Sequence, residues 1–183
     1  MPPLDAAQMD AGQKAAFDEI VGGRRGALYG PFVPALRSPE FMRRLQRLGE
    51  YLRYDSALPP HLREMTILLV AREWTQDFEW SVHAPLAREA GLPAAVVDGI
   101  AAGARPPGMD AQAALVFDFV AELQRTRGVS DATYGRAVAA FGERGVVDLV
   151  GTYGYYATLA MVMNVARTPL PEAEAPVLPA LPR

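Results

Sequence analysis

The stretch that decides the fold runs from residue 61 to residue 92 and reads HLREMTILLVAREWTQDFEWSVHAPLAREAGL. Its first part has the apolar periodicity of a strong helix. A second helix is expected to begin near Asp77, whose carboxylate can cap it, and to end at Gly91. The two helices are therefore predicted to form a hairpin that turns near Gln76.

One face of the second helix combines polar and apolar side chains. At a spacing of 3.6 residues per turn, this face holds Glu79, His83, Leu86, Ala87 and Ala90. The apolar members predict that the face points into the protein. Burying a carboxylate and an imidazole is costly unless they are paired, and at i, i+4 spacing Glu79 and His83 can pair.

The first helix of the hairpin contributes a further carboxylate. Glu64 lies on the same side as Leu68 and Ala71, and the hairpin would bring it toward His83 with an offset of about one turn. Two carboxylates around a partly buried histidine suit proton transfer, because burial raises a carboxyl pKa and a neighbouring imidazolium lowers it. Buried Glu–His pairs can also serve only to satisfy each other and fix helix register, so the pattern leaves both interpretations open.

Helix signals continue on both sides of the hairpin. A first helix is predicted from Ala6 to Val21, and residues 22–26, GGRRG, form a flexible turn because they lack the spacing and the Lys-Ser/Thr of a phosphate loop. Further helix starts are expected at Ser38, Pro93, Asp110 and Ser130, with a last helix from about Gly145 to Arg167.

No strand-like alternation persists anywhere in the chain. We therefore predict an all-α fold of seven or eight helices in a single domain over residues 1–183. Its core is expected over residues 6–167, followed by a proline-rich extended tail over residues 168–183.

Charge and composition narrow the partners and compartments. The formal net charge is −3 and the isoelectric point is about 5.4, which argues against a nucleic-acid partner and against a polybasic membrane anchor. No apolar run reaches about 18 residues, and no signal-like segment opens the chain, so we expect a cytoplasmic protein that does not span a membrane. The chain has no cysteine, which excludes disulfides, thiolate metal sites and thiol catalysis.

A metal cofactor lacks support in the sequence. The two histidines, His61 and His83, are not part of an HExxH motif, and a zinc site needs three or four ligands. We expect no metal and no other cofactor. The alternative is metal-dependent chemistry with Glu64, Glu79 and His83 as ligands.

The segment RxMTILLVAREW…FEWSVHAPLAREAGL, residues 63–92, resembles the carboxymuconolactone decarboxylase superfamily, which also contains alkyl hydroperoxidase D. The resemblance extends more loosely to Gly30-Pro31-Phe32, to Ser38-Pro39-Glu40 and to the helix around residues 154–164. It implies an all-helical fold in symmetric homo-oligomers, commonly trimers or hexamers, with pockets near subunit interfaces.

The two branches of this superfamily differ in the motif on the second helix. The peroxidase branch has Cys-x-x-Cys-x-x-x-His with an upstream glutamate; here His83 matches the histidine and Glu64 the glutamate, but the cysteine positions hold Gln76 and Glu79. Neither side chain can attack a peroxide, so thiol peroxidase activity is excluded. The decarboxylase branch has Glu-x-x-x-His, which is Glu79 to His83 here.

The resemblance implies a cofactor-independent decarboxylase that acts on a small carboxy-lactone or a related carbonyl acid. We expect His83 to donate the proton or stabilise the enolate, Glu79 to orient His83, and Glu64 to act as a second relay carboxylate. The alternatives are a non-thiol isomerase or hydrolase on a similar substrate, and a catalytically silent oligomer that binds a small molecule.

Three further residues are candidates for substrate binding. Trp80 and Trp74 are expected to wall the pocket and exclude water, although both also suit a plain core. Arg72 is a candidate anchor for a substrate carboxylate, because a guanidinium pairs with a carboxylate in a bidentate manner. A solvated helix face is the alternative for this arginine.

Overall fold

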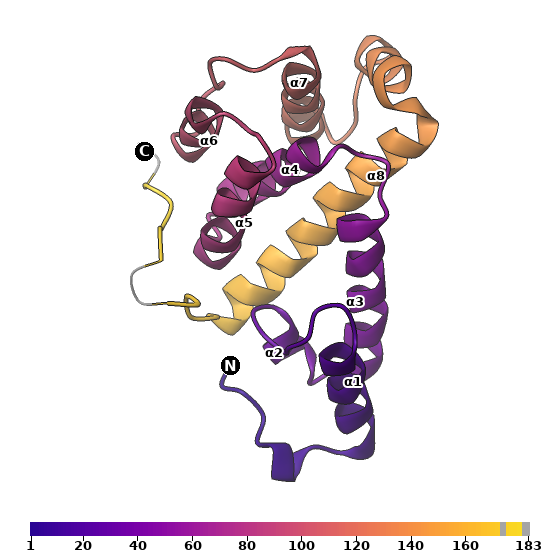
Figure 1. Cartoon of the computed structure of the whole chain (residues 1–183), viewed down its shortest axis with the longest axis vertical. Helices are drawn as coiled ribbons and strands as arrows, with labels where there is room; N and C mark the ends of the chain where they lie inside the picture. Colours follow the sequence, from indigo (N-terminus) through magenta and orange to yellow (C-terminus); the bar gives the residue numbers. More distant parts are fainter. Residues whose placement is uncertain (173–174, 181–183) are drawn as a thin grey trace.

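The helices gather on two sides of one long helix, α8 (Figure 1). The computed structural model describes residues 1–172 and 175–180, and this part of the chain is entirely helical apart from turns and extended segments, as predicted. Helices α4 to α7 lie on one side of α8, and α1 to α3 lie on the other (Figure 1). The elements are η1 (Ala6–Gln8), α1 (Ala11–Gly22), α2 (Phe32–Ala35), α3 (Pro39–Tyr54), α4 (Pro60–Glu73), α5 (Asp77–Glu89), α6 (Ala94–Ala101), α7 (Ala111–Thr126) and α8 (Asp131–Ala166).

The predicted hairpin is formed by α4 and α5. Every residue of α4 from Glu64 to Arg72 is buried, because α5, α6, α7 and α8 all pack against this helix. Thr75 turns the chain with a positive φ of 46°, and the side chain of Gln76 caps α5 by accepting a hydrogen bond from the Phe78 amide at 2.8 Å. The cap is therefore Gln76, and Asp77 is the first helical residue.

The N-terminal helix begins later than predicted. Asp10 and Gln13 form a capping box that starts α1 at Ala11, while residues 6–8 form the separate 3-10 turn η1. This reciprocal pair satisfies two backbone donors at once, so it fixes the start of α1 more strongly than the apolar spacing alone. The loop that follows α1 holds one short helix, α2.

The two C-terminal helices predicted on either side of residues 142–145 form one continuous element with a break. Gly142 has a φ of 69° and lies outside helical geometry, so α8 bends there. An 18-residue window of α8 has a mean hydropathy of 1.2 and is, by length and composition alone, able to cross a membrane. Within the fold 56% of that window is buried, and a core helix meets the same test.

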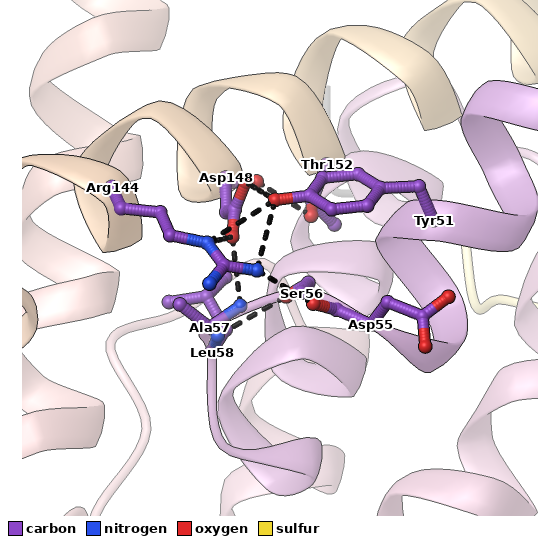
Figure 2. Close-up of polar contacts among 8 residues, drawn as sticks. All are labelled: Tyr51, Asp55, Ser56, Ala57, Leu58, Arg144, Asp148 and Thr152. Carbon is purple, nitrogen blue, oxygen red and sulfur yellow. Dashed lines mark hydrogen bonds and ion pairs between the residues drawn. The ribbon is translucent and has the colours of Figure 1, made fainter.

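A buried carboxylate fixes the link between α3 and α4 (Figure 2). Asp148 of α8 accepts hydrogen bonds from the Tyr51 hydroxyl at 2.9 Å and from the Ala57 amide at 2.7 Å. Arg144, one turn earlier, donates to the carbonyl of Asp55 at 3.0 Å. The end of α3 and the start of α4 are therefore tied to the same part of α8.

The C-terminal tail is held against the hairpin turn. Leu178 is buried in the apolar cluster of α4, α5 and α7, and its amide donates to Asp77 at 2.9 Å. Arg72 donates to the carbonyl of Pro179 at 2.7 Å. The tail predicted over residues 168–183 includes residues 173–174 and 181–183, which lie outside the described residues.

Candidate active site

A small cavity lies among α5, α8, the end of α3 and the segment that leads into α2. Its volume is about 30 Å³, which is room for water but well below the roughly 300–1,000 Å³ of an open ligand pocket. The cavity is lined by Arg25, Tyr29, Pro31, Phe32, Arg53, Phe78, Glu79, Val82, His83, Tyr155, Tyr156, Leu159 and Met163.

The hairpin brings Glu64 and His83 into direct contact. Nδ1 of His83 lies 2.7 Å from Oε2 of Glu64, and both side chains are buried. Burial alone raises the pKa of Glu64, but the hydrogen bond from His83 and the charges of Arg63 and Arg53 outweigh it, so this pKa lies below its ordinary value. Glu64 is therefore an ionised acceptor near neutral pH, which makes Nδ1 of His83 the donor.

The other ring nitrogen of His83 is left for chemistry. In the described part of the chain, Nε2 makes no hydrogen bond, and the imidazole lines the cavity. The ring of Tyr156 meets it edge-on, with ring centroids 5.1 Å apart. Glu64 and Tyr156 together hold the orientation of the imidazole, while Nε2 stays accessible to a bound molecule.

Glu79 is a buried acid without a partner. Its side chain is 3% exposed, and neither carboxyl oxygen has a hydrogen-bond partner among the described residues. Burial raises the pKa of Glu79 well above its ordinary value and so favours the neutral, protonated form of this carboxyl group. The hydrogen bond expected between Glu79 and His83 does not form, and Nδ1 of His83 instead contacts Glu64 from the other arm of the hairpin.

Two tyrosines of α8 complete the polar lining. Burial raises the pKa of Tyr155 to about 12 and that of Tyr156 well above its usual range, so both hydroxyls keep their protons. Arg25 donates to the Tyr155 hydroxyl at 3.2 Å. This contact depends on a glycine in α3, because a Cβ at Gly49 would overlap both the Tyr155 hydroxyl and Arg25.

Two arginines of the cavity were not identified from the sequence. Arg25 comes from the segment between α1 and α2, and Arg53 comes from the last turn of α3. Arg25 lies in the GGRRG stretch, whose composition indicates only a turn. Arg53 follows no motif, and its position in the cavity depends on the packing of α3 against α8.

The three residues proposed to bind substrate lie away from the cavity. Trp80 is buried in the core cluster formed by α4 to α8, and Trp74 is 37% exposed at the end of α4. Arg72 donates to the carbonyl oxygens of Ala101 and Pro179. It is therefore neither a solvated residue nor a side chain that faces the cavity.

The hypothesised metal ligands do not converge. Within residues 1–172 and 175–180, no three side chains of histidine, aspartate or glutamate come together as metal ligands would need to. Glu64 uses Oε2 on His83, and Glu79 forms no hydrogen bond with this pair. The site in this structure therefore consists of a hydrogen-bonded pair and a separate neutral acid.

The comparisons with known proteins agree on the fold. A model of the carboxymuconolactone decarboxylase family matches residues 39–122, from the start of α3 into α7. The chain is similar in structure to an uncharacterized peroxidase-related protein from Silicibacter sp. TM1040, with a TM-score of 0.72 and 17% sequence identity over 95% of this chain and 91% of that one. No curated protein matches the chain.

Proposed function

We propose that the cavity catalyses cofactor-independent proton transfer at a small carbonyl acid, and the match of the carboxymuconolactone decarboxylase family model to residues 39–122 supports this proposal. The reaction that we favour is decarboxylation of a carboxy-lactone. The observation that carries this proposal is Glu79, a buried neutral acid without a partner, beside the His83–Glu64 pair.

The proposed reaction breaks the bond between the substrate carbon and its carboxylate. The electron pair of that bond moves into a conjugated carbonyl, which gives an enolate and CO2. Glu79 then donates its proton to the enolate carbon next to the carbonyl, and solvent restores the proton to Glu79. In its protonated form His83, held at Nδ1 by Glu64, donates a hydrogen bond from Nε2 to the enolate oxygen as negative charge develops there.

This assignment keeps one of the two roles that the sequence suggested for His83, stabilisation of the enolate. It gives proton donation to Glu79, which was expected to orient His83, and that orienting role to Glu64. The unpartnered acid, Glu79, is the better proton donor, because its proton is not shared with another side chain. His83 is the better oxyanion donor, because Glu64 fixes one of its nitrogens and leaves the other accessible. Substrate entry requires outward movement of Arg25 and Arg53, which are only partly buried, because the closed cavity has room only for water.

Lactone hydrolysis is the second candidate, and the size of the cavity favours it. A volume of about 30 Å³ accommodates water beside His83. An imidazole with Nδ1 fixed by a carboxylate is the usual arrangement for a general base that activates water. Hydrolysis opens the lactone without release of CO2, so one product analysis separates the two reactions.

The test is an assay of purified protein on a panel of carboxy-lactones and β-keto acids in D2O. We expect release of CO2 and incorporation of one deuterium at the carbon next to the carbonyl. We also expect His83→Ala to lower turnover while circular dichroism shows an unchanged fold. Ring opening without CO2 would favour hydrolysis. Absence of turnover on the whole panel would reject both reactions and leave a silent small-molecule binder.

We further propose that the protein self-associates into a homo-oligomer. Four of the exposed apolar residues of α8 share one helix face: Val147 at 69% exposure, Val165 at 76% exposure, and Val150 and Met161 between them. An apolar stripe of this length on one helix is typical of an interface. A second copy of the chain is its expected partner.

A further inference from the structure

Two positive charges in the cavity lack a negative partner. Arg25 and Arg53 both line it, and in the described part of the chain neither forms an ion pair. Arg24, the sequence neighbour of Arg25, differs in this respect, because it pairs with Asp55 at 3.5 Å outside the cavity. Guanidinium groups in proteins carry a permanent charge.

The charges around the cavity leave an excess of positive charge. Glu64 is ionised, but it is hydrogen-bonded to His83, and Glu79 is neutral. Burial lowers the pKa of Arg53, but the surrounding tyrosines and Glu64 outweigh it, so this group stays cationic. Two guanidinium charges without a carboxylate partner of their own in the described ranges of the chain favour a bound anion.

The guanidinium group of Arg25 also has a buried N–H group without a hydrogen-bond acceptor among the residues that the structure describes. Its Nε is buried and has no hydrogen-bond partner within the described residues, while one terminal nitrogen donates to the Tyr155 hydroxyl at 3.2 Å. A buried donor without an acceptor is costly, and a carboxylate that binds the guanidinium fork would remove this cost. We propose that Arg25 and Arg53 together form a receptor for a substrate carboxylate.

The carboxylate that they hold is the one that remains in the product. An arginine pair on the departing carboxylate would stabilise the ground state and so slow the loss of CO2. The receptor is therefore suited to a second carboxylate on the same molecule, and it makes the preferred substrate a dicarboxylic carbonyl acid. This part of the inference rests on the proposed function, whereas anion binding by the two arginines does not.

The experiment titrates acetate and its neutral analogue acetamide into the protein and follows binding by NMR. We expect saturable binding of acetate and none of acetamide. Arg53→Gln and Arg25→Gln should each weaken acetate binding by about tenfold or more. Arg53→Lys should retain part of the acetate binding that Arg53→Gln loses. Arg24→Gln makes the same charge change outside the cavity and should leave acetate binding unchanged.

Absence of saturable acetate binding would overturn the receptor, as would equal binding of acetamide or an equal loss in Arg24→Gln. Turnover then tests the substrate class: Arg53→Gln should raise KM more than it lowers kcat, and only for substrates with a second carboxylate. Acetate binding without turnover on any carbonyl acid would reject the proposed function and keep the receptor. Turnover of a carbonyl acid without acetate binding would reject the receptor and keep the proposed function.

Discussion

Burial of Glu79 favours proton donation but lowers the stability of the fold at neutral pH. Burial raises the pKa of Glu79, so between its unfolded and folded pKa values the folded state holds a proton that the unfolded chain has lost. The free energy of unfolding therefore falls as pH rises through this range, by about 1.4 kcal/mol per pH unit. A residue with only a structural role would gain nothing from this loss of stability, which supports a chemical role for Glu79.

Replacing Glu79 with glutamine should therefore stabilise the protein. The amide cannot ionise, so Glu79→Gln should have a larger free energy of unfolding than the wild type at neutral pH, and the difference should shrink toward about pH 4. Urea unfolding of both proteins at the two pH values measures this. Equal stabilities at neutral pH would contradict a neutral buried acid at this position.

The His83–Glu64 pair predicts strong coupling between two substitutions. His83→Ala leaves a buried carboxylate without its partner and should cost about 3–5 kcal/mol of stability. Adding Glu64→Gln removes the uncompensated charge, so the double variant should lose less stability than the two single losses summed. A double-mutant cycle by denaturant unfolding tests this, and strict additivity would contradict the contact.

The helical elements explain which parts of the site were predictable. The α4–α5 hairpin follows from local apolar spacing, so the meeting of Glu64 and His83 could be predicted from one segment of sequence. The contributions of Arg25 and Arg53 depend on packing between distant elements. Gly30 illustrates this: a Cβ there would lie 2.6 Å from the Phe78 ring, so the close approach of this segment to α5 requires glycine, and no local periodicity indicates it.

Arg72 is expected to stabilise the fold rather than bind substrate. Its guanidinium joins the end of α4 to the carbonyl oxygens of Ala101 and Pro179 and to the Thr75 hydroxyl. Arg72→Gln should lower the free energy of unfolding by about 1–3 kcal/mol and leave turnover per folded molecule unchanged. A raised KM without lost stability would instead support the substrate role suggested by the sequence.

The whole molecule presents an apolar stripe that its own chain leaves uncovered. This stripe consists of Val147, Val150, Met161 and Val165 on α8. The sequence indicates α8 as a helix, but which of its faces stays exposed depends on how the other helices pack around it. The proposed interface can therefore be recognised only from the packing of the whole molecule.

Self-association provides the test of the stripe. Sedimentation velocity should show an oligomer for the wild type and a shift toward monomer when Val147 and Val165 are both changed to glutamate, because two charges would be buried without partners. Val177→Glu introduces the same residue at an exposed valine of the tail and should keep the oligomer. A monomeric wild type would contradict the proposed interface.

The most direct test of the proton-transfer site is turnover of γ-carboxymuconolactone by the wild type and by Glu79→Gln under conditions where both are folded. We predict that the wild type consumes the lactone with release of CO2, and that the variant is slower by about a hundredfold or more. Wild-type rates in Glu79→Gln would show that this acid does not donate the proton. No consumption by the wild type would contradict the decarboxylase proposal itself.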